Sequence, residues 1–69
     1  MAKSKLLGVD DDPAIRFAVR DFMELSGFEV DEADSCAQAE AKYRRDVYDA
    51  VTLDYALGDG TALDLLPRL

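Results

Sequence analysis

The chain has 69 residues and a formal net charge of −7, with one cysteine and no histidine. A chain of this length forms one small domain with little stability to spare. Its acidic charge argues against binding to nucleic acid or to an anionic membrane. Because Cys36 is the single cysteine, an intramolecular disulfide is excluded, and no zinc-binding pattern is present. No apolar run is long enough for a signal peptide or a membrane span, so we expect a cytoplasmic protein.

The first half of the chain predicts a strand, a helix and a second strand. Residues 5–9 form a short apolar run that is typical of a strand. Asp12 and Pro13 are suited to the N-cap and the first position of a helix, which Gly27 can end. Residues 28–33 alternate apolar and acidic side chains, which indicates an edge strand with one solvated face.

The helix after Pro13 is predicted to be amphipathic. We expect its polar side to carry Arg16, Arg20, Asp21 and Glu24. The apolar side recurs at helical spacing and comprises Ile15, Ala18, Val19, Phe22 and Leu25.

The second half of the chain predicts a helix, a strand and the start of a third helix. Ser35 and Gln38 form the Ser-x-x-Gln pattern of a capping box. Residues 50–53 are apolar without strict alternation, which indicates a strand covered on both faces. Beyond a flexible Gly58–Gly60 turn, Thr61 is expected to cap a short helix weakened by a later proline.

This alternation of strands and helices predicts an α/β fold. Right-handed crossovers place the three strands in a parallel sheet in the order 2-1-3, with helices on both faces. The first and third strands are therefore neighbours.

Both of these neighbouring strands end in carboxylates. Asp10, Asp11 and Asp12 come after the first strand, and Asp54 comes after the third. Because parallel strands end at the same edge, we expect these acids to converge, where mutual repulsion would favour a bound cation. Carboxylate oxygens suit Mg²⁺, so the pattern predicts a magnesium site. The simpler interpretation of Asp54, that it only caps a turn, stays open at this point.

Together these segments resemble the receiver domain of bacterial two-component response regulators. The similarity lies in LGVDDDPAIR at 7–16 and LDYALGDG at 53–60, and it is nearest to receivers of nitrogen-regulation and redox-responding regulators. The resemblance implies that residues 1–69 are the amino-terminal half of a flavodoxin-like receiver fold. It implies a signalling module and not an enzyme.

The resemblance also implies roles for single residues. Asp54 matches the phosphoacceptor, which would take a phosphoryl group from a histidine kinase. The implied Mg²⁺ ligands are the carboxylates of Asp10, Asp11 and Asp54 and the backbone carbonyl of Ala56. Asp12 lies where the family varies, and we expect it to cap the helix.

The sequence departs from the family beyond residue 54. Gly58 stands where many receivers have proline, and Ala62 where many have glycine. Receivers have five strands, and the later ones supply a switch Ser or Thr and a Lys that pairs with the phosphoryl group. Lys3, Lys5 and Lys42 lie elsewhere, so we expect phosphotransfer in this chain to be impaired.

Other functions remain as alternatives. The chain could be a self-assembling half-domain with a silent acidic site, because its strand at 50–53 lacks charges that would guard an open edge. On this ground we expect a homodimer or a larger oligomer. An aspartate-nucleophile phosphatase is disfavoured by Ala14 and by the lack of a downstream lysine. A calcium loop starting at Asp54 is disfavoured because Ala56 and Gly58 offer no oxygen side chains.

Overall fold

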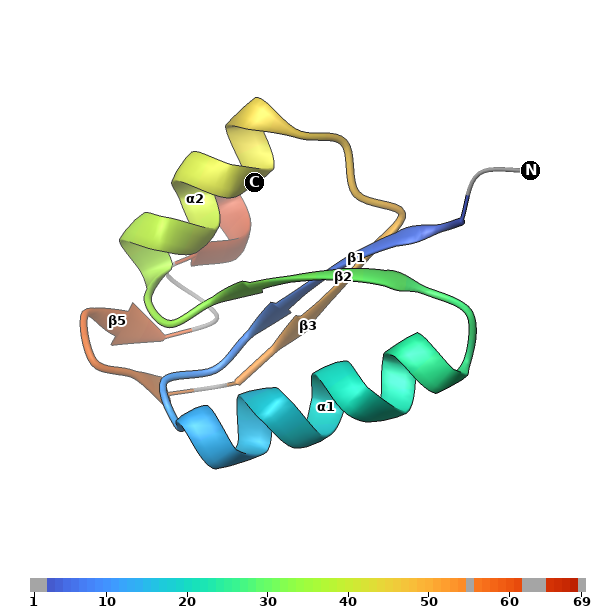
Figure 1. The fold of residues 1–69 in the computed structure, drawn as a ribbon. Coiled ribbons are helices and arrows are strands. Elements are labelled where there is room, and N and C mark those ends of the chain that lie inside the picture. Colours follow the sequence, from blue (N-terminus) through green and yellow to red (C-terminus); the bar gives the residue numbers. More distant parts are fainter. Residues whose placement is uncertain (1–2, 55, 62–64, 69) are drawn as a thin grey trace.

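The computed structural model describes residues 3–54, 56–61 and 65–68. Within these ranges strands and helices alternate as the sequence predicts (Figure 1). In chain order the elements are β1 (Lys5–Val9), α1 (Pro13–Leu25), β2 (Glu29–Ala33), α2 (Cys36–Arg45), β3 (Ala50–Leu53), β4 (Ala56–Leu57), β5 (Gly60–Thr61) and the 3-10 turn η1 (Leu66–Arg68).

The main sheet has the predicted parallel order, β2-β1-β3. Val9 of the central strand is in register with Ala33 of β2 and Leu53 of β3. α1 and α2 cover opposite faces of this sheet (Figure 1). Because the three strands are parallel and in close register, their carboxyl ends lie along one edge.

Both ends of α1 are formed by the residues that the sequence indicates. Asp12 is the N-cap, and its Oδ1 accepts a hydrogen bond of 2.9 Å from the amide of Ala14. Gly27 comes after the last turn with φ of +96°, a conformation that L side chains rarely adopt. This glycine therefore lets the chain leave the helix and enter β2.

The start of α2 differs in detail from the predicted capping box. Ser35 is the N-cap, and its Oγ accepts from the amide of Gln38 at 3.1 Å. The Gln38 side chain, however, accepts from the amide of Asp34 at 2.7 Å. The pattern still satisfies two backbone donors, but the second lies one residue earlier than in a standard box.

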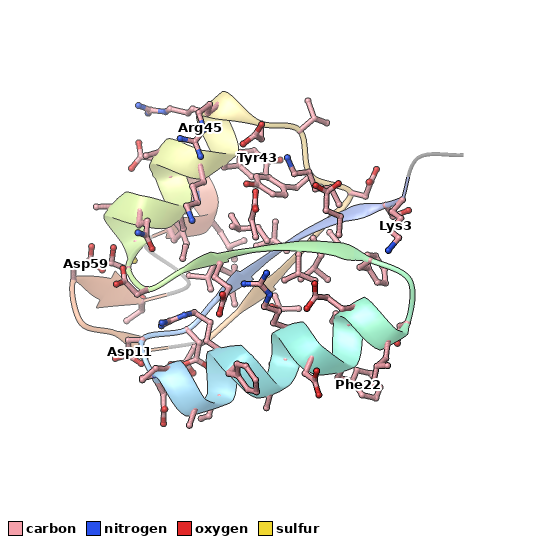
Figure 2. All side chains as sticks on the ribbon, viewed as in Figure 1. Lys3, Asp11, Phe22, Tyr43, Arg45 and Asp59 are labelled. Carbon is pink, nitrogen blue, oxygen red and sulfur yellow. The ribbon has the colours of Figure 1, made fainter. Side chains whose placement is uncertain are left out.

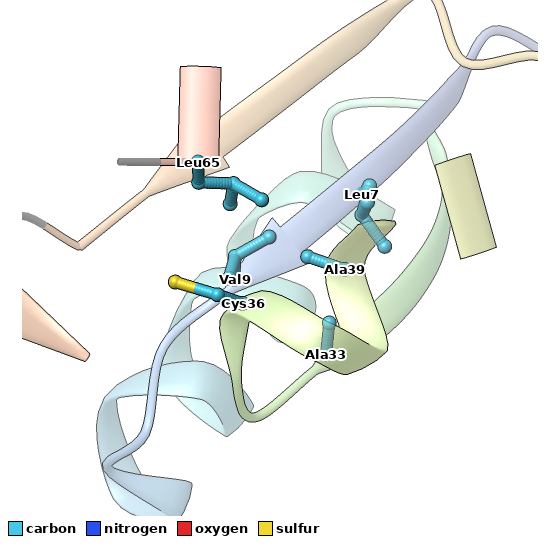
Figure 3. Close-up of a cluster of buried hydrophobic side chains, with 6 residues drawn as sticks. All are labelled: Leu7, Val9, Ala33, Cys36, Ala39 and Leu65. Carbon is cyan, nitrogen blue, oxygen red and sulfur yellow. The ribbon is translucent and has the colours of Figure 1, made fainter. Parts of the chain in front are cut away.

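The hydrophobic core lies between the sheet and α2. Six buried side chains form it, and they come from β1, β2, α2 and the segment before η1: Leu7, Val9, Ala33, Cys36, Ala39 and Leu65 (Figure 3). Cys36 is fully buried, as a packing residue should be. The small Ala33, Cys36 and Ala39 side chains let α2 approach the sheet closely. Leu65 is fully buried in this cluster.

α1 packs on the sheet with the side that carries two of its arginines. Its half-buried residues are Arg16, Val19, Arg20 and Met23, whereas most of the predicted apolar stripe points to solvent. Ile15, Phe22 and Leu25 are 51%, 66% and 83% exposed. In this orientation Glu32 on β2 forms ion pairs with Arg16 at 3.3 Å and with Arg20 at 2.8 Å. These contacts hold the arginines against the sheet.

The segment after β3 also departs from expectation. In place of a flexible turn, β4 and β5 pair as a short antiparallel hairpin in which Ala56 is opposite Thr61. Thr61 lies in β5, and the start of the helix that it is predicted to cap lies outside the described residues. The predicted capping partner Asp64 lies outside the described residues, and the chain beyond it forms η1. β3 is an outer strand whose residues are half-buried, so it is not covered on both faces as predicted.

The described helices are short compared with the length that a bilayer requires. α1, the longest, has 13 residues, and no helix in the described ranges could span a membrane.

Candidate functional site: an acidic cluster at the carboxyl edge of the sheet

The sheet holds the backbones of two acids side by side. The amide of Asp10 donates to the carbonyl of Ala33 at 3.1 Å, and the amide of Asp54 donates to the carbonyl of Val9 at 3.0 Å. The parallel ladder therefore continues one residue past the ends of β1 and β3. As a result, Asp10 and Asp54 leave adjacent strands at the same level.

Three of the predicted ligands meet at this edge. One carboxylate oxygen each from Asp10, Asp11 and Asp54 lies within 4.8 Å of the others. Asp10 and Asp54 are half-buried and Asp11 is exposed. Oxygens bound to one Mg²⁺ on opposite sides lie about 4 Å apart, given bond lengths of about 2.1 Å. A spacing of up to 4.8 Å is slightly wider than this, so the carboxylates would close a little around an ion, and their all-oxygen donor set suits a small divalent cation.

Asp12 has a separate role, as the sequence predicts. Its carboxylate caps α1, and its own amide donates to Asp10 Oδ1 at 2.9 Å. This second bond fixes the orientation of the Asp10 carboxylate. Asp12 therefore shapes the turn without joining the cluster.

Arg16 is a residue of this site that the sequence analysis assigned to the solvated side of the helix. Its Nη1 donates to the backbone carbonyl of Asp10 at 2.9 Å, and its Nε lies 3.3 Å from Glu32 Oε1. One guanidinium thus connects α1, β2 and the acidic turn. Its position one turn into the helix was visible in the sequence, but its partner on β2 was not.

A cavity of about 180 Å³ lies beside the cluster. Asp10 and Asp54 line it, and α1 contributes Arg16 and Val19. The remaining lining residues come from the ends of β1 and β3: Gly8, Val9, Thr52 and Leu53. The two half-buried carboxylates therefore border open space between the sheet and α1.

Asp59 is the second residue that the sequence analysis did not identify. It lies in the turn of the β4–β5 hairpin, and its carboxylate accepts from the amides of Cys36 at 2.8 Å and Ala37 at 3.0 Å. These hydrogen bonds lower the pKa of Asp59 from its ordinary value. Asp-Gly after a strand is a local signal for a hairpin, but nothing local indicates a contact with residues 22 positions earlier.

The remaining predicted ligand is the backbone carbonyl of Ala56. This residue begins β4, two residues beyond Asp54. Its role as a carbonyl ligand of the metal stays a prediction.

No lysine in the described part of the chain reaches the cluster. Lys5 Nζ lies 3.8 Å from Asp31 and 3.5 Å from Asp46, and Lys42 Nζ donates to the carbonyl of Glu32. Figure 2 shows Lys3 at the opposite end of the molecule from Asp11. These positions agree with the expectation that no lysine here replaces the family's phosphoryl partner.

Comparisons with known proteins agree with this geometry. The sequence matches the response regulator receiver domain over residues 6–69. It is 39% identical over 67 residues to the alginate biosynthesis transcriptional regulatory protein AlgB of Pseudomonas putida, covering 97% of this chain and 15% of AlgB. Chemotaxis protein CheY4 of Vibrio cholerae superimposes with a TM-score of 0.89 at 30% identity, over 93% of this chain and 53% of CheY4.

A two-component response regulator from Clostridium difficile is similar, with a TM-score of 0.87 at 30% identity over 91% of this chain and 52% of the other. The chain thus spans about half the length of these solved receivers and a smaller part of AlgB. The parallel sheet, the acids at its carboxyl edge and the matched sequence together show that the chain belongs to the receiver domain family of two-component response regulators.

Proposed function

We propose that the chain is a cytoplasmic phosphoacceptor module in which Asp54 receives a phosphoryl group from a histidine kinase. The observation that carries this proposal is the convergence of Asp10, Asp11 and Asp54 within 4.8 Å at the ends of two adjacent strands. A half-buried carboxylate with two acidic neighbours suits a cation-dependent nucleophile better than a turn cap, because a cap needs no second acid.

The proposed reaction moves a phosphoryl group from a phosphohistidine to the carboxylate of Asp54. A carboxylate oxygen of Asp54 attacks the phosphorus of a phosphohistidine, forming an O–P bond while the P–N bond breaks. The imidazole leaves with the bonding electron pair and takes up a proton. Each chain accepts one phosphoryl group and releases no product, which describes a signalling module and not an enzyme with turnover.

We further propose Asp10, Asp11, Asp54 and the Ala56 carbonyl as the residues that would hold Mg²⁺. When bound, the ion neutralises phosphoryl oxygens and so favours the approach of an anionic donor to an anionic site. The carboxylates supply hard oxygen ligands, and the bond from the Asp12 amide keeps the Asp10 carboxylate oriented for this purpose.

In the 69-residue chain we expect this transfer to be slow. The described lysines are engaged or distant, so the charge that develops on the phosphoryl group would lack a lysine partner from this chain. Removing one such stabilising group typically costs about 10²-fold to 10³-fold in rate.

Self-assembly is a second candidate function, and one observation favours it. α1 exposes Ile15, Phe22 and Leu25, and β3 is an outer strand without charged residues. Both are surfaces that a second copy could cover. In this alternative the acid cluster would have no role in phosphotransfer. With a net charge of −7, we do not propose binding to nucleic acid in either case.

Labelling with acetyl phosphate and Mg²⁺, followed by intact mass spectrometry, separates the two candidates. We expect slow addition of one phosphoryl group to the parent and none to Asp54→Asn. Asp34→Asn is the matched control, because Asp34 comes directly after β2 as Asp54 does after β3 but lies outside the cluster. A parent chain that stays unlabelled after prolonged incubation would favour self-assembly. Rapid stoichiometric labelling would support the acceptor role and contradict its impairment.

A further inference from the structure

The β4–β5 hairpin is attached to the start of α2 by side-chain and backbone contacts. Asp59 accepts from two successive amides of α2, those of Cys36 and Ala37. The Cys36 thiol, which is fully buried, lies 3.9 Å from the carbonyl of Thr61 on β5. Figure 2 shows Asp59 beside the beginning of α2, at the same edge of the molecule as Asp11.

These contacts cap the start of α2. The first four amides of a helix have no partner within it. Of these, Gln38 donates to Ser35 Oγ, and Cys36 and Ala37 donate to Asp59. A negative charge is also favourable at this end of the helix dipole. Asp59 therefore has a defined position relative to α2, which is itself packed on the sheet through Cys36 and Ala39.

The same hairpin carries Ala56. This residue is paired with Thr61 across the hairpin, and Asp59 lies in the turn that joins the two strands. At its other end the hairpin comes after Asp54, whose amide is bonded to Val9. The backbone at Ala56 is thus held between two fixed points, the end of β3 and the start of α2.

Resting on the proposed function, we infer that Asp59 is a positioning residue for the metal site. Its bond to α2 fixes the hairpin and so determines where the Ala56 carbonyl lies relative to Asp54. Because such coupling is reciprocal, a cation bound at the acid cluster changes the environment of the Cys36 and Ala37 amides, although neither residue is a ligand.

The test is a Mg²⁺ titration of the ¹⁵N-labelled chain, monitored by amide shifts. In the parent we expect the signals of Cys36 and Ala37 to move together with those of Asp10 and Asp54. Asp59→Asn loses the charge and one of the two acceptors, and we expect its affinity for Mg²⁺ to fall about tenfold. We also expect its Cys36 and Ala37 signals to stop responding.

Two further variants separate positioning from charge and from folding. Asp34→Asn makes the same charge change near the start of α2 and is expected to bind Mg²⁺ as the parent does. Asp59→Glu keeps the carboxylate and is expected to stay within about threefold of the parent affinity. The inference is overturned if Asp59→Asn binds as tightly as the parent, or if Asp59→Glu is as weak as Asp59→Asn.

Hydrogen exchange without metal tests the inference independently of the proposed function. Asp59→Asn should exchange the hairpin amides faster than the parent, because the attachment to α2 is weakened. If the parent fails to bind Mg²⁺, the proposed function fails, and hydrogen exchange alone decides the role of Asp59. Equal exchange rates in parent and variant would refute the attachment.

Discussion

At the scale of single residues, the site depends on side chains that reach from one element to another. The side chains of Asp12, Arg16 and Asp59 each bond to a backbone group at the acidic turn or on a neighbouring helix. None of them is a member of the cluster. Their common effect is to fix the turns that carry the acids, since the acids themselves lie just beyond the ends of strands.

Arg16 gives a prediction at this scale. Arg16→Met removes the bond to the Asp10 carbonyl and leaves Glu32 with Arg20 alone. Because Arg16 and Glu32 are only 21% and 28% exposed, we expect a loss of about 1 to 2 kcal/mol in the free energy of unfolding, measured with urea.

Arg44→Met is the matched control for that substitution. Arg44 pairs with Glu40 at 2.6 Å, but its side chain is 72% exposed. An exposed pair of this kind contributes little, so we expect a change below about 0.5 kcal/mol. If both variants lose the same free energy of unfolding, the contacts of Arg16 do not stabilise the fold more than those of an exposed arginine.

At the scale of elements, α1 is amphipathic, but its row of large apolar residues does not face the sheet. Its apolar residues recur at helical spacing, yet the helix presents Arg16, Val19, Arg20 and Met23 to the sheet. This is a rotation by about one residue, or roughly 100°. In this orientation Arg16 and Arg20 pair with Glu32, and a row of apolar side chains lies in solvent.

This exposed row gives the prediction on self-association. Sedimentation equilibrium at micromolar concentrations should give an apparent mass above that of one chain, because burial of these side chains favours association. Phe22→Asp should reduce the apparent mass. Phe17→Asp is the control, since Phe17 is equally exposed at 67% but lies on a different side of α1. A parent that is monomeric at all concentrations would contradict the prediction.

The elements also show which features a sequence can predict. The caps of Asp12 and Ser35, the glycine that ends α1 and the strand order depend on local residue types and the alternation of elements. The acid cluster is predictable as well, because the strand order determines which strand ends are adjacent. The attachment of Asp59 to α2 and the pairing of Arg16 with Glu32 could not be predicted, since each joins residues on different elements without a local signal.

At the scale of the whole molecule, the two faces of the sheet are packed unequally. The buried cluster lies between the sheet and α2, whereas no residue of α1 is fully buried. The acids lie at the carboxyl edge, where the two sides meet. The α2 side holds Asp59 and the hairpin, and the α1 side holds Arg16 and the cavity. Contacts from the helices on both faces of the sheet therefore stabilise the site.

The central claim is that Asp10, Asp11 and Asp54 form one cation site, and a Mg²⁺ titration by calorimetry tests it most directly. We expect the parent to bind one Mg²⁺ weakly, and Asp54→Asn to bind at least about tenfold more weakly because one of few charged ligands is lost. Asp34→Asn, with the same change in charge, should match the parent. If Asp54→Asn binds Mg²⁺ as well as the parent does, the three acids do not form the site.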